Sequence, residues 1–196
     1  MKPTINTNIF LVILVTFLSV SGANAAGIGK NIVVRLAGEG LADGSGNQFT
    51  QLGLVAPEGV FCFDMDLVNA KTGKVIGSGS DCLSDINPSD NGGMALTATS
   101  FFHFPRGTLV SRGLVTVQPK LHGLEEFTHV TGAAPSPSEN NVIYGDGRFK
   151  HAAGSVRLSG LVNLERFESG YIDFDCVFII DIETPRHGRR KHRHDD

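Results

Sequence analysis

The stretch "YGDGRFKHAAGSVRL", residues 144–158, decides the fold of this chain. Its three glycines, Gly145, Gly147 and Gly154, could in principle cradle a phosphate. A phosphate-binding loop of that kind must open a helix, because the helix N-terminus supplies the donors that hold the anion. Here the glycines lead instead into "SVRLSGLVNL" (155–164), in which the residues alternate with the period of a strand. The pattern therefore predicts no nucleotide site.

We interpret the same glycines as the corner of a β-structure. Gly145 and Gly147 permit a positive φ, and Gly154 lets another backbone pass closely as the chain enters a sheet. Phe149 is then expected to plug one end of the core.

Strand-like runs separated by Gly, Pro, Asn and Asp recur along the rest of the chain, and no helical periodicity is evident after residue 25. Nine candidate strands are close to the eight that close a small barrel, so we predict an all-β fold, an eight-stranded antiparallel barrel. The expected strands are 31–37, 48–54, 60–68, 74–83, 94–104, 108–119, 127–132, 155–164 and 170–182.

The last of these runs, "YIDFDCVFII" (171–180), has one wholly apolar face. That face is predicted to pack inward or against another subunit, and it consists of Ile172, Phe174, Cys176, Phe178 and Ile180.

The two ends of the sequence differ from its middle. The apolar run 9–20 followed by Ala23-Asn24-Ala25 predicts a signal peptide over 1–25, a barrel domain over 26–185 and a secreted or periplasmic protein. The run is too short to span a bilayer. Residues 186–196 are rich in Arg and His and are expected to be a solvated tail. This tail could also capture zinc or copper, or contact anionic glycans.

Net charge gives no reason to expect a nucleic-acid partner. The full chain carries −3, and removal of residues 1–25, which contain one Lys and no acid, leaves −4.

Three cysteines in an exported chain invite one disulfide. Cys62 and Cys82 lie on two strands joined by a short turn, but the register of those strands decides whether they meet, so the sequence leaves this bond open. Cys176 is expected to be a buried thiol.

Several polar side chains have both a structural and a functional interpretation. Asp64 and Asp66 share one face of a strand, and Asp173 and Asp175 share another; both pairs are expected on the solvated exterior. His103, His129 and Tyr144 are candidate acid, base or ligand-binding groups, although a structural role is the commoner one for such residues.

"VTGA" (130–133) and "GDGRFKHAAGSVRLSG" (145–160) resemble the segment "TGG-x-G-x-F-x-x-A-x-G" of the allene oxide cyclase and dirigent proteins, and "GKVIGSGSDCLSD" (73–85) is similar to their "G-x-x-V-G-x-x-x-G" strand. The similarity in order and spacing covers residues 48–182. It implies an eight-stranded antiparallel barrel, often trimeric, with an apolar cavity and no metal or redox cofactor.

The resemblance extends to one catalytic element. Cys82 stands where the plant cyclases have a cysteine, whereas Arg35 and Ala37 stand roughly where those enzymes have an acid and an amide. The resemblance therefore implies, at most, an isomerase of the cyclase type. Candidate catalytic residues are Cys82, His103 and Tyr144; candidate ligand-binding residues are Cys82, Phe102, Phe104, Phe149, Phe174 and Phe178.

Two functions follow as expectations. The first is a secreted barrel that binds a small hydrophobic molecule in its lumen and steers a cyclisation or isomerisation without a cofactor. The second is a non-catalytic extracytoplasmic binding or structural barrel, a homo-oligomer (trimer or dimer) whose basic tail holds a partner.

Overall fold

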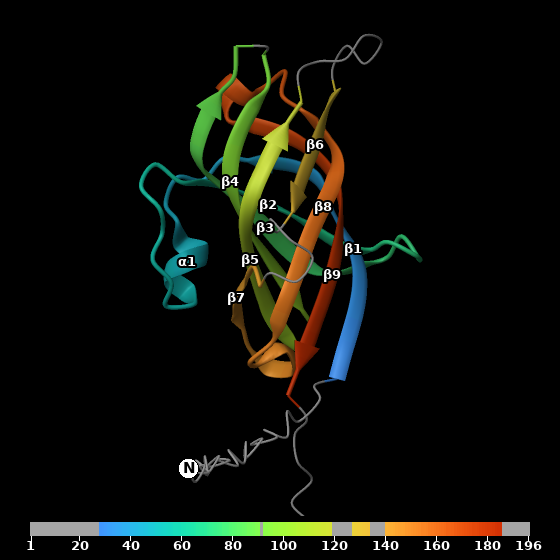
Figure 1. Cartoon of the computed structure of the whole chain (residues 1–196). Helices are drawn as coiled ribbons and strands as arrows, with labels where there is room; N and C mark the ends of the chain where they lie inside the picture. The colour runs from blue at the N-terminus through green and yellow to red at the C-terminus, as the bar shows by residue number, and fades with distance from the viewer. Residues whose placement is uncertain (1–27, 91, 119–126, 134–139, 186–196) are drawn as a thin grey trace, which may run out of the picture.

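The protein folds into a closed eight-stranded antiparallel β-barrel with one extra short strand, as a computed structural model shows (Figure 1). The structure describes residues 28–90, 92–118, 127–133 and 140–185, so the expected signal peptide and tail lie outside the described residues. The strands follow the order β4-β3-β2-β1-β9-β8-β6-β5-β7, and pairing of β4 with β5 closes the ring. The predicted fold class is confirmed.

The elements have the following bounds: β1 Ile28–Leu41, α1 Asn47–Gln51, β2 Phe61–Asn69, β3 Val75–Pro88, β4 Met94–Phe104, β5 Gly107–Val117, β6 Phe127–Ala133, β7 Val142–Gly145, η1 Gly147–Phe149, β8 Ala153–Asn163, η2 Phe167–Ser169 and β9 Tyr171–Thr184.

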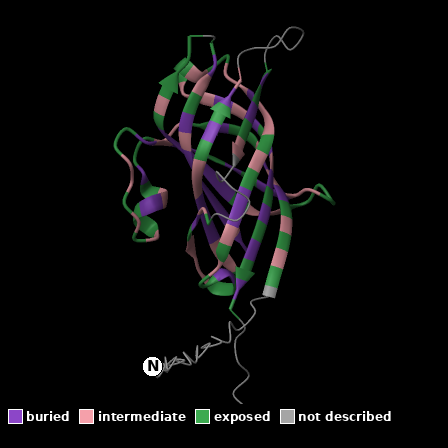
Figure 2. Cartoon of the chain, viewed as in Figure 1, coloured by how far each residue is buried: buried purple, intermediate pink, exposed green. Residues whose placement is uncertain are grey.

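Alternation of side chains places the core inside the ring. On β9 every second residue is buried, and the face predicted to be apolar is the interior one, with Cys176 and Ile180 fully buried. Figure 2 shows buried residues along the other strands as well, and on β3 and β4 both faces are buried in the middle of the strand. Each strand therefore contributes one row of side chains to a shared core.

The predicted strand at 48–54 is wrong. Its first part forms the short helix α1, because Gly46 and Gly53, both with positive φ, turn the chain out of an extended path at either end. The loop that carries α1 lies against the outside of the barrel (Figure 1). Conversely, β7 was not predicted, because four residues are too short a run to show a period.

The loop around α1 covers a second apolar cluster on the outer face of the barrel. It is tied down where the backbones of Asp43 and Cys62 exchange two hydrogen bonds of 2.8 and 2.9 Å. We call this set of buried residues the outer cluster: Phe49, Val60, Cys62, Cys82, Phe101 and Val110.

The disulfide left open by the sequence is present between Cys62 and Cys82, within the outer cluster. The two residues are direct partners across β2 and β3. A simple hairpin that pairs Val68 with Lys74 would place Cys62 opposite Ser80. The actual turn pairs Val68 with Val75, and a bulge beside Val68 shifts the register by one further residue, which brings the two cysteines together.

Between β5 and β8 the wall of the barrel passes from β6 to β7. Both of these strands pair with β5, and β6 also pairs with β8. Where β6 gives way to β7, the Asn141 N–H donates a backbone hydrogen bond to the Gly154 carbonyl of β8 (3.0 Å), and the side chains of two asparagines add further bonds to β8. The Asn141 amide donates to the Val156 carbonyl (2.9 Å) and accepts from the Val156 N–H (2.7 Å), and Asn140 accepts from the Gly154 N–H (2.9 Å). Asn141 thus mimics a strand residue.

The glycine corner that decides the fold contains only the single turn η1 before β8 begins. Gly147 has φ 49°, whereas Gly145 does not need a positive φ, contrary to expectation: a Cβ there would lie 2.2 Å from the Phe149 carbonyl oxygen. Gly154 has φ 146°, and its Cβ would lie 2.2 Å from the Asp181 carbonyl oxygen. Phe149 is fully buried at this end of the core, as predicted.

Gly154→Ala is expected to destabilise the barrel by about 2–4 kcal/mol, because it adds a left-handed backbone strain to a steric clash with β9. Gly29→Ala is the matched control, since a Cβ at Gly29 meets nothing within 4 Å. Urea unfolding of both variants measures the difference, and equal stabilities would contradict the close approach described here.

Reduction of the Cys62–Cys82 bond is expected to lower the free energy of unfolding by about 3 kcal/mol, because the bond closes a loop of moderate length in the unfolded chain. Unfolding with and without a thiol reductant measures this loss. The Cys62→Ala/Cys82→Ala variant should be indifferent to the reductant; a reductant effect of the same size in that variant would assign the loss to another cause.

Candidate functional site

Aromatic side chains fill much of the barrel interior. Phe102 packs edge-on against Phe178, with ring centroids 5.0 Å apart, and Phe104 lies at the same distance from Phe149. These four rings and Phe174 all belong to the main core cluster, so the candidate ligand-binding phenylalanines are first of all packing residues.

Within the described residues, the interior also holds one carboxyl group, that of Asp81 on β3. Asp81 is 3% exposed, and its strand neighbours in register are Phe63 on β2 and Ser100 on β4. The Ser100 hydroxyl donates a hydrogen bond of 2.6 Å to it. Burial disfavours the ionised form and raises the pKa of Asp81 to about 7, while the Ser100 hydrogen bond acts in the opposite direction.

Asp81 is the functional candidate that sequence reasoning missed. In "GSGSDCL" (77–83) it alternates with Gly79 and Leu83 and therefore lies on the opposite face from Cys82. Once the disulfide is assigned to the outer face, the same alternation directs Asp81 into the lumen.

Two small cavities lie on either side of the Asp81–Ser100 pair. The first, which we call the upper cavity, lies toward the end of the barrel that is uppermost in Figure 1. Its volume is about 20 Å³, it is lined by apolar side chains from six strands and η2, and Asp81 is the one ionisable group among the described residues that line it. The second cavity, also about 20 Å³, is bordered by Ser100, Ser111 and Phe178. Each has room for about one water molecule.

Cys82 does not face the lumen. It is oxidised in the disulfide and lies in the outer cluster, so it offers no thiol to a molecule inside the barrel. The interior thiol belongs to Cys176, which is fully buried. Burial first, and then the nearby charges of Asp81 and Asp175, raise the pKa of Cys176 well above its usual range, so this thiol stays protonated.

The other polar candidates also lie outside the lumen. His103 is half-buried, with its Nδ1 3.2 Å from the Thr108 hydroxyl, and His129 is exposed. The Tyr144 ring packs on the outer cluster, and its hydroxyl lies 3.4 Å from a carboxylate oxygen of Asp146. Partial burial and the charge of Asp146 raise the pKa of Tyr144.

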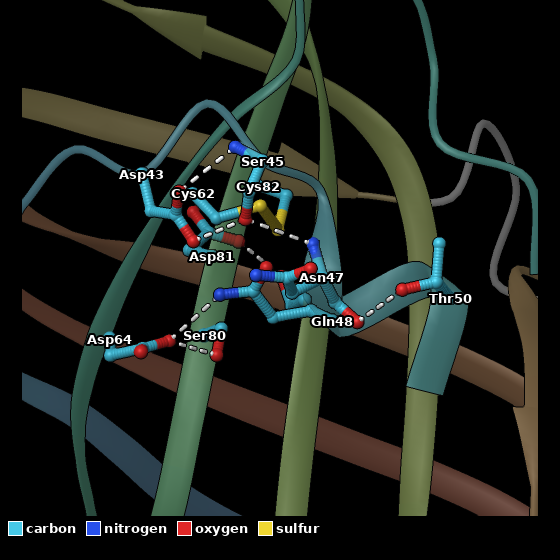
Figure 3. Close-up of a disulfide and its surroundings, with 11 residues drawn as sticks. Asp43, Ser45, Asn47, Gln48, Thr50, Cys62, Asp64, Ser80, Asp81 and Cys82 are labelled. Carbon is cyan, nitrogen blue, oxygen red and sulfur yellow. Dashed lines mark hydrogen bonds between the residues drawn. A yellow bond between two sulfur atoms is a disulfide. The ribbon is translucent and has the colours of Figure 1, made fainter. Parts of the chain in front are cut away.

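His103 borders a polar groove of about 370 Å³ between α1 and the barrel wall. Asp64 lines this groove and accepts hydrogen bonds from Ser80 (2.5 Å) and Gln48 (3.2 Å), as Figure 3 shows beside the disulfide. The Gln48 Oε1 atom is buried and has no hydrogen-bond partner within the described part of the chain. The hydrogen bond from Gln48 to Asp64 attaches α1 to the barrel wall at this groove.

The paired acids predicted to be exterior are exterior. Asp64 and Asp66 are exposed, and neither lies in the core. Asp175 forms a salt bridge of 2.6 Å with Arg35, and Asp173 pairs with Arg166 at 3.4 Å. These contacts are solvent-exposed and contribute little to stability.

Comparison of the chain with protein-family models gives no match, and comparison with curated protein sequences gives none either. No helix within the described ranges has the length and apolarity that a bilayer crossing requires. Over the same residues, no group of three or more His, Cys, Asp or Glu side chains could hold a metal ion.

Asp81 makes the stability of the barrel depend on pH. Because folding raises its pKa, the folded state binds more protons than the unfolded state between about pH 4 and pH 7, so stability falls as pH rises through this window. The fall attributable to Asp81 is at most about 4 kcal/mol. Asp81→Asn should remove it.

Urea unfolding at several pH values tests this expectation. The exposed Asp66→Asn variant is the control and should keep the wild-type slope, because its carboxyl is hydrated in both states. An Asp81→Asn variant whose pH slope equals that of the wild type would show that Asp81 is not buried as described.

Proposed function

We propose that the protein binds a small hydrophobic molecule in the upper half of the barrel lumen, where Asp81 and Ser100 hold a polar group of that molecule. The buried carboxyl is the observation that carries the proposal. A carboxyl inside an apolar core costs stability, and one hydrogen bond from Ser100 leaves most of its lone pairs unpaired. A hydroxyl, carbonyl or amine of a ligand would supply the missing partner.

The entrance lies at the upper end. The side chains at the rim of the upper cavity are Met94, Leu164 and Phe167, all only partly buried. A cavity of about 20 Å³ is far smaller than the few hundred Å³ of an ordinary ligand site, so a ligand must displace these rim side chains. Methionine and a phenylalanine on the short η2 turn can move without breaking a strand.

Asp81 also limits the chemistry of the ligand. With a pKa of about 7, its carboxyl is protonated in mildly acid solution and can donate a hydrogen bond to a carbonyl or ether oxygen. Any steering of a cyclisation would then rest on shape and on this one group, without a cofactor. The disulfide supports export to an oxidising compartment, secreted or periplasmic.

A second candidate is a non-catalytic barrel that acts as a structural or binding protein in an oligomer. The well-filled interior favours it, because aliphatic side chains and packed phenylalanine rings occupy most of the lumen. Val33 and Ile179, which pair across β1 and β9, are 41% and 38% exposed on the outer wall. An apolar pair of this kind supports a contact with another copy of the chain.

Uptake of a lipophilic fluorophore such as 1-aminoanthracene, measured by fluorescence at neutral pH, tests the lumen proposal. Val162→Phe, which fills the upper cavity, should weaken uptake at least tenfold, because the added ring occupies the space that the probe needs.

Val33→Phe adds the same bulk on the outer wall and is the control; it should leave uptake unchanged. Thermal unfolding of both variants confirms that they are folded. Equal uptake by all three proteins, or none by the wild type, would favour the structural candidate.

A further inference from the structure

The lower end of the barrel, opposite the upper cavity, carries a second and larger depression. We call it the lower mouth. It has a volume of about 660 Å³ and lies between the start of β1, the ends of β2 and β4, the start of β3, and η1. Its residues used below are Lys30, Ile32, Val34, Ile76, Phe104 and Arg148.

Two cations stand over aromatic rings at this mouth. The guanidinium carbon of Arg148 lies 4.9 Å from the centroid of the Phe104 ring and 4.5 Å from that of Phe149. The Lys30 ammonium lies 5.8 Å from the Phe149 ring and donates to the backbone carbonyl of Arg148 at 3.3 Å. Contact with the two rings restrains the guanidinium, and no side-chain hydrogen bond of Arg148 forms within the described residues, so its N–H groups remain available to a ligand.

Neither cation has an acidic partner in the part of the chain that the structure describes. The ion pairs there involve Arg35 and Arg166, and no carboxylate lies within 4.0 Å of Lys30 or Arg148. Partial burial and the like charge of Arg106 lower the pKa of Arg148. Cations gathered without a counter-charge form a site that an oxyanion would stabilise.

The rest of the lower mouth is apolar. Ile32 and Ile76 are partly buried and pack against the core, and Val34 is fully buried beneath them. An alkyl chain could lie on this surface while its charged end reaches Lys30 and Arg148. Fully buried Leu109, Phe102 and Phe178 lie in the core between this mouth and the upper cavity, so the two sites do not depend on each other.

We propose that the lower mouth binds a small amphipathic anion, whose carboxylate or phosphate pairs with Lys30 and Arg148 and whose alkyl chain covers Ile32 and Ile76. The site needs no ligand in the lumen. A test of this site is therefore independent of a test of the proposed function.

Calorimetric titration with decanoate, decyl phosphate and decanol, each below its aggregation limit, tests the charge requirement. At least one of the two anions should bind roughly tenfold or more tightly than decanol, because a charged hydrogen bond adds to the same apolar contact. Their relative affinity tells whether carboxylate or phosphate is the better fit. Raising NaCl from about 0.05 to about 0.5 M should weaken anion binding. Decanol that binds as tightly as both anions would overturn the proposal.

Variants locate the site. Lys30→Gln and Arg148→Gln should each weaken anion binding roughly tenfold, since each removes one charged hydrogen bond. Lys30→Gln leaves the Arg148 stack intact, so it remains informative if Arg148→Gln is unstable. Lys74→Gln, at an exposed turn, is the control and should bind like the wild type. Unchanged affinity in Lys30→Gln would refute the assignment.

Two further variants distinguish this site from other places on the protein where the anion could bind. A chain ended after Pro185 lacks the basic residues of 186–196 and should retain the wild-type affinity; loss of binding would assign the anion to those residues instead. Val162→Phe, which blocks the upper cavity, should also retain it. Loss of anion binding in that variant would place the molecule in the lumen and overturn the lower-mouth site.

Discussion

The structure depends on continuous backbone hydrogen bonding around the ring of strands. A barrel has no free edge, so every interior strand residue is shielded only if each neighbour pair stays bonded. The strand ladder is interrupted at the change from β6 to β7, where the amide of Asn141 takes both the donor and the acceptor role that a strand backbone would have toward Val156. Because the side chains of Asn140 and Asn141 bond to the β8 backbone here, the chain can leave and re-enter the wall without opening the core.

Closure also forces every strand to commit one face to the interior, whatever residues that face carries. On β3 the disulfide and the loop with α1 hold Cys82 on the outer face, and the same alternation then buries Asp81. A shift of one residue would hydrate Asp81, but it would also separate Cys82 from Cys62 and break the outer cluster. The buried carboxyl is thus maintained by covalent and apolar contacts on the other side of the wall.

Strand periodicity and the glycine corner suffice to predict the barrel, because they are local properties of the sequence. The helix α1 is not predictable in this way: "QFTQLGL" (48–54) is too short to establish a helical period, and the positive φ of Gly46 and Gly53 turns it out of the sheet. The residues of the two candidate sites are even less predictable from the sequence. Strand register and barrel closure bring Asp81 next to Ser100 and Lys30 next to Arg148. The bulge beside Val68, which sets the register of β2 and β3, has no clear sequence signal.

The two ends of the barrel present different chemistry, and nothing inside connects them electrostatically. The pKa of Asp81 is governed by burial and by Ser100 alone, with no contribution from a cation. The positive charges at the lower mouth therefore do not relieve the carboxyl buried above them, since the packed phenylalanines keep the two apart. Asp81 bears the cost of burying a carboxyl, whereas Lys30 and Arg148, which keep contact with solvent, lack an acidic partner among the described residues. That is the physical reason to look for one ligand at each end.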